Sequence, residues 1–185
     1  IFKFFCRPFG KFLCEFFIES YDPNDILGPA GFGDDRWIAF DDPLLYTIRF
    51  ENDPVKATAA AQEVYVTQQL DSTLDWRSFR LGEFGFGEYR FQVPENSATY
   101  QTRIDVRDSL NLFVDVSAGI DITTGEAFWR FESVDPLTGE LPWSDGFLPP
   151  NDTLGRGTGE GFVTYSVKPK ATAQTRDIVN AEARI

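Results

Sequence analysis

Carboxyl groups are the side chains of this sequence whose number and spacing first suggest chemistry. Glycoside hydrolysis uses two carboxyl groups that face one cleft. Acids of this kind lie in residues 112–142: Asp115, Asp121, Glu126 and Glu140. However, the chain holds 29 acidic residues against 17 basic ones, so pairs of carboxylates arise from abundance alone. It has no His and carries no recognised catalytic motif. We therefore predict that the chain is not an enzyme and has no catalytic residue.

Two groups of oxygen-bearing side chains are spaced closely enough to suggest a calcium ion. The first group comprises Asp22, Asn24 and Asp25. The second surrounds a long loop: Asp135, Thr138, Glu140, Ser144, Asp145, Asn151 and Asp152. Turns and caps use the same residue types without any metal. We therefore expect no cofactor and no metal ligands, with a structural calcium ion as the open alternative.

Aromatic side chains beside Gly-rich loops suggest a sugar-binding surface, because an exposed ring can stack on a pyranose. The candidates are Phe84, Phe86, Tyr89, Trp143 and Phe147. The sequence contains 19 Phe against 4 Trp, which favours core packing for most of these rings. The Gly-rich residues 82–87 lack a Lys and a following helix, so they do not form a phosphate loop. We expect them to form an irregular connection between hairpin strands at residues 76–81 and 88–93.

The elements that must position these residues are β-strands, and the clearest of them lie in residues 112–142. Apolar residues occupy every second position of the first run: Leu112, Val114, Val116, Ala118, Ile120 and Ile122. A two-residue period indicates a strand with one buried face and one solvated face. Gly125 can supply the positive φ of a tight reversal, after which Ala127, Trp129 and Phe131 resume the alternation. The stretch is therefore predicted to be a β-hairpin.

Further strand-like runs, separated by turn residues, occupy most of the remaining chain. They cover residues 44–50, 63–70, 76–81, 88–93, 99–106, 162–167 and 178–185. About eight strands of this length predict an all-β, Ig-like two-sheet antiparallel β-sandwich, with a closed barrel as the alternative. Tyr46 and Tyr65 fit either face. The residues expected to be buried are Ile48, Phe50, Val64, Val66, Leu112, Val114, Val116, Ile120, Trp129 and Phe131.

The first 43 residues differ from the strand-rich part of the chain. Residues 1–20 carry Phe at helical spacing and several basic residues, but Pro8 and Gly10 interrupt any helix. They are too short and too charged to span a membrane, so we place them outside the domain, with a membrane-surface helix as the alternative. Residues 21–43 are predicted to form an irregular Asp/Gly/Pro-rich lead-in. Residues 44–185 then form the sandwich, with a last strand that we expect to be truncated. Because the chain has no Met, we also expect a fragment or a processed piece.

Charge and cysteine usage limit the partners and the chemistry of the fold. The net charge is −12 at pH 7, and an acidic surface repels phosphate backbones, so we expect no nucleic-acid partner. Both cysteines, Cys6 and Cys14, lie in the first segment. The fold of the remaining chain is therefore predicted not to depend on disulfides.

Several motifs, taken in their order along the chain, resemble one family. They are Asp22-Pro23-Asn24-Asp25, residues 46–52, Trp129, residues 146–151, residues 161–165, Lys168-Pro169, and the ending with Asn180, Ala181, Ala183 and Ile185. Over residues 21–185 the chain resembles an Ig-like repeat domain of very large secreted and cell-surface proteins of cyanobacterial, planctomycete and Bacteroidota type. That family has no established enzymatic activity.

The resemblance implies an extracellular or cell-surface location and a repeated, adhesive or spacer-like role. It implies as partners the neighbouring domains of the same chain, and also surface glycans or other cell-surface proteins. We therefore predict a non-catalytic structural or adhesive module of a large exported bacterial protein. The alternative is a carbohydrate-binding module that uses the loop aromatics.

Overall fold

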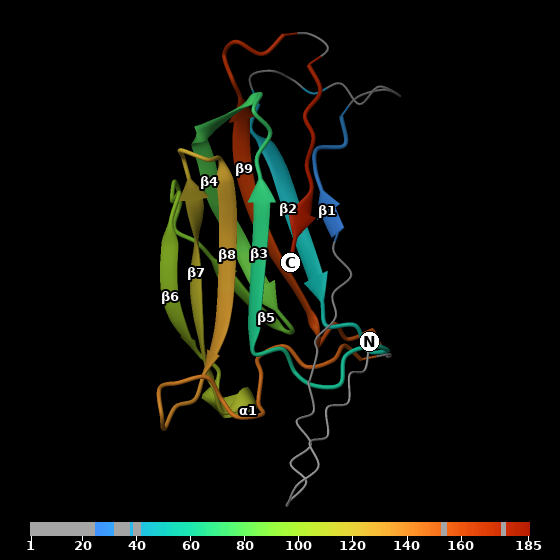
Figure 1. Ribbon diagram of the computed structural model, residues 1–185, viewed down its shortest axis with the longest axis vertical. Coiled ribbons are helices and arrows are strands. Elements are labelled where there is room, and N and C mark those ends of the chain that lie inside the picture. The colour runs from blue at the N-terminus through green and yellow to red at the C-terminus, as the bar shows by residue number, and fades with distance from the viewer. Residues whose placement is uncertain (1–24, 32–37, 39–41, 153–154, 175–176) are drawn as a thin grey trace, which may run out of the picture.

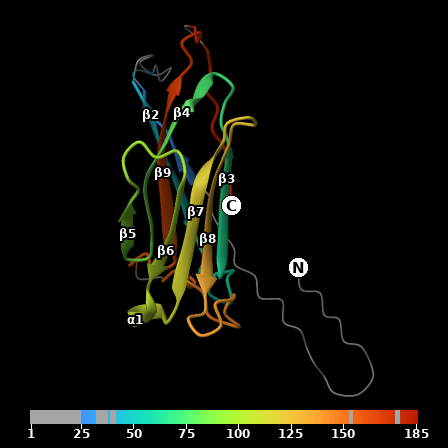
Figure 2. The ribbon, with the colours of Figure 1, turned by 90° about the vertical axis from the view of Figure 1, so that its left-hand side faces the viewer.

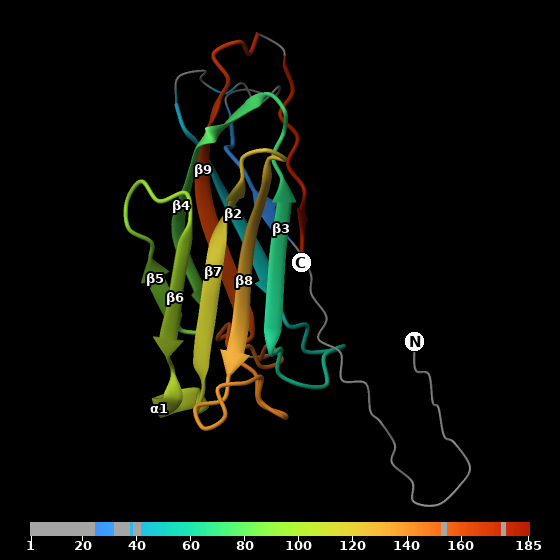
Figure 3. The same ribbon diagram turned by 60° about the vertical axis from the view of Figure 1, so that its left-hand side comes forward.

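In the computed structural model, which describes residues 25–31, 38, 42–152, 155–174 and 177–185, ten strands form two antiparallel sheets (Figure 1). The first sheet has the order β1 (Asp25–Leu27), β2 (Leu44–Glu51), β9 (Glu160–Pro169), β4 (Leu74–Phe86) and β5 (Tyr89–Gln92). The second has the order β10 (Ala183–Arg184), β3 (Glu63–Gln69), β8 (Glu126–Val134), β7 (Phe113–Asp121) and β6 (Tyr100–Asp105). One helical turn, α1 (Arg107–Leu110), connects β6 to β7. Figures 2 and 3 show the two sheets packed face to face. The predicted all-β, two-sheet sandwich is therefore confirmed, with ten strands in place of about eight.

The predicted hairpin is formed by β7 and β8, which pair along their full length. Gly125 closes the turn with φ +77°, and a Cβ at this position would collide with the Trp76 ring. β7 ends at Asp121, so the alternation stops earlier than predicted. Ile120 is consequently only partly buried, and Ile122 lies in the turn and is exposed.

The core lies between the sheets and is built largely from aromatic rings. The Trp129 ring of β8 lies 5.6 Å from that of Tyr165 on β9 and 6.1 Å from that of Phe79 on β4, between centroids. Tyr46 is buried and stacks on Tyr165 at 5.0 Å, whereas Tyr65 faces outward and is 52% exposed. The remaining predicted core residues other than Ile120 are buried: Ile48, Phe50, Val64, Val66, Leu112, Val114, Val116 and Phe131.

The prediction for residues 82–87 was wrong. Instead of forming an irregular connection, most of this stretch is the end of β4, and the chain passes into β5 through a tight turn at Gly87, where φ is +50°. β4 pairs with β9 with two shifts of register along its length. Bulges of this kind break the two-residue alternation from which a strand is predicted.

Two short strands, β1 and β10, are edge strands of the two sheets. β1 lies in the lead-in that was predicted to be irregular, and it pairs with β2. The strand predicted at 178–185 is reduced to β10, which pairs with β3 next to β1 (Figure 1). Asp71 holds this last segment by accepting the backbone N–H of Asn180 at 3.0 Å. Residues 1–20 lie outside the described residues, and within the described part no helix is long and apolar enough to cross a bilayer.

Candidate functional site

The acids considered as catalytic candidates occupy structural positions. Asp115 accepts two hydrogen bonds from Arg103, at 2.6 and 2.7 Å, and these bonds lower the pKa of its carboxyl group. Asp121 accepts hydrogen bonds from the hydroxyl and the backbone N–H of Thr123 in the hairpin turn. These bonds lower the pKa of the Asp121 carboxyl group as well. Glu126 lies opposite Asp121 in the ladder, at an exposed hairpin end, and it lines a hollow of about 800 Å³ together with Asp71 and Glu182. Glu140 is exposed on the loop after β8.

The oxygen-rich residues considered as calcium ligands are engaged in turns and ion pairs. Asp135 accepts the backbone N–H groups two and three positions along the chain, at 2.7 and 3.1 Å. Asp25 forms an ion pair with Arg49, while Asp22 and Asn24 lie outside the described residues. In the described part of the chain, no three His, Cys, Asp or Glu side chains are arranged to hold a metal ion.

Four of the five aromatic candidates belong wholly or partly to the interior. Phe84, Phe86 and Phe147 are buried in the core. Tyr89 is half-buried against Phe86 and Phe91 and forms a hydrogen bond to the hydroxyl of Ser109. Trp143 is 99% exposed and presents its whole indole ring to water.

Trp143 is one of several exposed apolar residues on the loops at one end of the sandwich, the end from which α1 and the loop after β8 project (Figure 1). We call this group of residues the loop end, and it comprises Val55, Leu137, Leu141 and Trp143. The two loops that carry it are tied together by backbone bonds between Ala61 and Leu148, at 2.7 and 3.4 Å.

Buried side chains fix the same two loops to the sandwich. The Asn52 amide donates to the carbonyl oxygens of Ala59 and Leu148, both at 2.9 Å, and the Gln62 amide donates to that of Pro142 at 2.6 Å. The buried ring of Phe147 inserts between the sheets from the same loop. The exposed Trp143 is therefore presented on an anchored loop.

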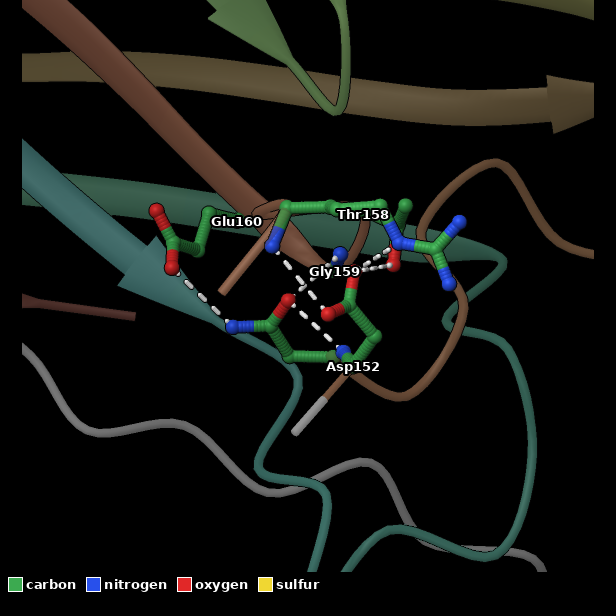
Figure 4. A network of polar contacts seen from close by, with 6 residues as sticks. Asp152, Thr158, Gly159 and Glu160 are labelled. Atoms are coloured by element: carbon green, nitrogen blue, oxygen red, sulfur yellow. Dashed lines mark hydrogen bonds and ion pairs between the residues drawn. The ribbon is translucent and has the colours of Figure 1, made fainter. Parts of the chain in front are cut away.

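A third loop is organised by the side chain of Asn151, and Figure 4 shows the polar network around its neighbours Asp152, Gly159 and Glu160. Its amide nitrogen donates to Glu51 on β2 at 2.8 Å and to Glu160 on β9 at 3.0 Å. Its amide oxygen accepts the backbone N–H groups of Gly159 and Asp152, at 3.1 and 2.9 Å. One neutral side chain thus fixes two neighbouring carboxylates at the rim of the first sheet.

Beside this loop, the outer face of the first sheet is hollowed into a groove of about 540 Å³. Its central row crosses all five strands in register: Asp25 on β1, Arg49 on β2, Phe162 on β9, Gly85 on β4 and Arg90 on β5. A Cβ at Gly85 would lie 2.7 Å from the Phe162 ring and 2.9 Å from the Arg90 guanidinium. Glycine therefore leaves the space in which the arginine extends over the phenylalanine.

The outer face of the second sheet carries a more open hollow of about 580 Å³. It is lined in part by Tyr65 and Phe128, but its arginine is already neutralised. Arg130 pairs with Glu63 at 2.8 Å and with Glu132 at 3.1 Å. The groove on the first sheet is therefore the stronger candidate for a charged ligand.

The family comparison matches only part of the chain. A family described as a domain of unknown function (DUF7619) matches residues 22–108, just under half of the sequence. The matched part runs through β1–β6 and leaves β7, β8, β9 and β10 outside it. Searches of curated proteins and of solved structures found no match. The similarity is compatible with the sandwich and assigns no activity.

Sequence reasoning did not find the groove. Arg49 and Phe162 stand at outward positions of strands that were predicted correctly, so their exposure was foreseeable. Arg90 also lies in a predicted strand, but Gly85 was assigned to a connection. Only the register among five strands brings these four residues into one row, and a single sequence carries no signal for that register.

Proposed function

We propose that this chain is a non-catalytic structural or adhesive module of a larger exported bacterial protein, located outside the cell or at its surface. The observation that carries the proposal is the loop end, which holds the three most exposed large apolar side chains of the described residues: Val55, Leu137 and Trp143. Trp143 is 99% exposed and Leu137 is 95% exposed, on a loop that Phe147 anchors in the core. Exposed apolar surface of this kind marks contacts with proteins or ligands. We infer that a neighbouring domain of the same polypeptide covers the loop end.

The remaining surface supports the spacer role. Ion pairs cover the outer face of the second sheet, including those of Arg130 with Glu63 and Glu132. The net charge of −12 favours solubility and opposes non-specific association between copies. Five-stranded antiparallel sheets supply a stiff body whose loops meet other domains, surface glycans or surface proteins.

The alternative function is a carbohydrate-binding module. The exposed ring of Trp143 favours it, because an indole that is open to water can stack on a pyranose ring. Tyr89 does not add to such a surface, since its ring packs against Phe86 and its hydroxyl is bonded to Ser109. The alternative therefore depends on Trp143 and predicts that glycan binding is lost in Trp143→Ala.

Quenching of tryptophan fluorescence by acrylamide tests the proposed neighbour contact. The chain is compared with a longer piece of its natural polypeptide that includes the adjoining domains. In each of the two proteins, the emission of Trp143 is obtained as the difference between the wild type and its Trp143→Phe variant. We expect Trp143 to be quenched freely in the isolated chain and shielded in the longer polypeptide. Leu137→Ala should reduce the shielding. Ile122→Ala, which changes an exposed apolar residue at the opposite end, is the matched control and should leave it unchanged.

Equal quenching in the short and the long polypeptide would overturn the neighbour contact. A glycan array with the isolated chain then decides for or against the alternative. Saturable binding that Trp143→Ala abolishes supports the carbohydrate module, and release of product from any glycan contradicts both functions.

A further inference from the structure

The groove on the first sheet concentrates guanidinium groups in a chain that is otherwise strongly acidic. Arg49, Arg90 and Arg156 all line it, although the chain carries a net charge of −12. Two of these arginines have carboxylate partners: Arg49 pairs with Asp25, and Arg156 lies 3.8 Å from Asp152. Arg90 has no carboxylate partner among the residues that the structure describes. It is therefore the group through which the groove can recognise a negative charge.

Arg90 is held in one orientation by the protein. Its Nη1 donates to the carbonyl oxygens of Gly87 at 3.0 Å and Tyr89 at 2.8 Å. Its Cζ lies 4.7 Å from the centre of the Phe162 ring, over the space left by Gly85. Nε and Nη2 form no hydrogen bond within the described residues, so this edge of the guanidinium is left open. Two parallel N–H groups are the geometry that binds a carboxylate in bidentate fashion.

The other wall of the groove accepts hydrogen bonds. Glu51 and Glu160 stand on adjacent strands, and the amide of Asn151 orients both carboxylates. Thr47 contributes a hydroxyl group to the same lining. A ligand that forms hydrogen bonds with both walls must carry one negative group for Arg90 and several hydroxyl donors for the glutamates.

We propose that this groove binds a uronic-acid residue of an acidic polysaccharide, with its carboxylate on Arg90 and its ring hydroxyls towards Glu51 and Glu160. A neutral sugar would leave the open edge of Arg90 unpaired. An acidic peptide would supply a carboxylate for Arg90 but not the neighbouring ring hydroxyls whose hydrogen bonds Glu51 and Glu160 can accept. The proposal goes beyond the contact at the loop end, because no step of it uses Trp143.

Isothermal titration at low salt tests the proposal with digalacturonate and, as the neutral counterpart, the matching galactose disaccharide. We expect saturable binding of digalacturonate and binding at least about tenfold weaker for the neutral sugar, because only the acid forms the charge-assisted pair. Arg90→Gln should weaken digalacturonate binding by about tenfold or more. Arg77→Gln removes an exposed arginine on β4 that lies outside the groove. It should change the affinity for digalacturonate by less than about twofold.

Arg90→Lys keeps the charge but removes the planar fork of the guanidinium, so it should also lose most of the affinity for digalacturonate. It serves as a second variant if Arg90→Gln lowers the melting temperature. Trp143→Ala should leave digalacturonate binding unchanged, which separates this site from the loop end. Equal affinity for the acidic and neutral disaccharides, or full affinity in both Arg90 variants, would overturn the proposal. Binding of a short polyglutamate peptide as tight as that of digalacturonate would overturn the assignment to a sugar.

Discussion

Two tryptophans at opposite extremes of exposure have opposite roles in this protein. Trp129 is 2% exposed and contacts aromatic rings of the other sheet, including Tyr165 at 5.6 Å. Trp143 is 99% exposed and makes no contribution to the core. The first ring stabilises the sandwich by removing a large apolar area from water, and the second offers the same kind of area to a partner.

Replacing these two residues with alanine should therefore have different consequences. Trp129→Ala is expected to lower the free energy of unfolding by about 3–5 kcal/mol, because it leaves a large cavity between the sheets. Trp143→Ala should change it by less than about 0.5 kcal/mol. Urea unfolding followed by circular dichroism measures both values. Similar losses for the two variants would show that Trp129 is not in the core.

Protonation of a single aspartate should release the end of the chain. Burial raises the pKa of Asp71, but hydrogen bonds from Thr73 and Asn180 outweigh it, so the pKa lies below the ordinary value of 3.8. A lowered pKa means that the bonds stabilise the folded state above that value and are lost as pH falls through the folded pKa. As pH falls below 3.8 we therefore expect smaller protection factors for amide hydrogen exchange at Asn180 and in β10, that is, exchange closer to the intrinsic rate at the same pH.

Asp71→Ala should reproduce this loss of protection at neutral pH, where Asn180 loses its acceptor. Asp121→Ala removes a comparable turn cap at the hairpin and is the matched control, because it touches no part of the final segment. Exchange in β10 that is unchanged in Asp71→Ala would contradict this account of how the segment is held.

At the scale of the elements, β4 is the strand on which both the core and the groove depend. Its inward residues Phe79, Leu81, Phe84 and Phe86 are buried, while Gly85 gives room on the outer face. One of its two register shifts against β9 lies between Leu81 and Phe84, so the positions that face the core change from odd to even along the strand. Such bulged strands re-aim side chains near functional surfaces.

Gly85→Ala tests whether this glycine holds the groove open. The added methyl group would press against the Tyr89 carbonyl oxygen, the Phe162 ring and the Arg90 guanidinium, so we expect a loss of about 1–3 kcal/mol in the free energy of unfolding. The aromatic ring signals of Phe162 should also shift in NMR spectra. Gly139→Ala is the comparison, because no atom lies within 4 Å of a Cβ at that position, although its φ of +74° adds backbone strain. A Gly85→Ala protein as stable as the wild type would show that Arg90 does not lie over Phe162.

The strands that could be predicted from the sequence are those with an unbroken two-residue period. β2, β3, β7 and β8 alternate buried and outward residues along most of their length, and all four were predicted. β1 and β10 have three and two residues, too few to show any period. The end of β4 was missed because its glycines lower β-propensity and its bulges interrupt the alternation. The groove was missed because it depends on register among distant strands.

For the whole molecule, the sandwich is expected to fold without a metal ion. The carboxylates of the long loop cap turns, as Asp135 does for the two amides that follow it. The melting temperature should therefore be the same in millimolar calcium and in chelator, because only a ligand that binds the folded state raises it. A rise in calcium that is reversed by chelator would establish a structural site, and Asp22 with Asn24 would be examined first.

The central claim is that the chain binds without catalysing, through two separate surfaces. An array of acidic and neutral glycans, probed with wild type, Arg90→Gln and Trp143→Ala, tests it most directly. We predict binding to uronate-containing glycans that is lost in Arg90→Gln and kept in Trp143→Ala, with every glycan recovered intact. Binding that depends on Trp143 and not on Arg90, or the release of any product, would contradict the account.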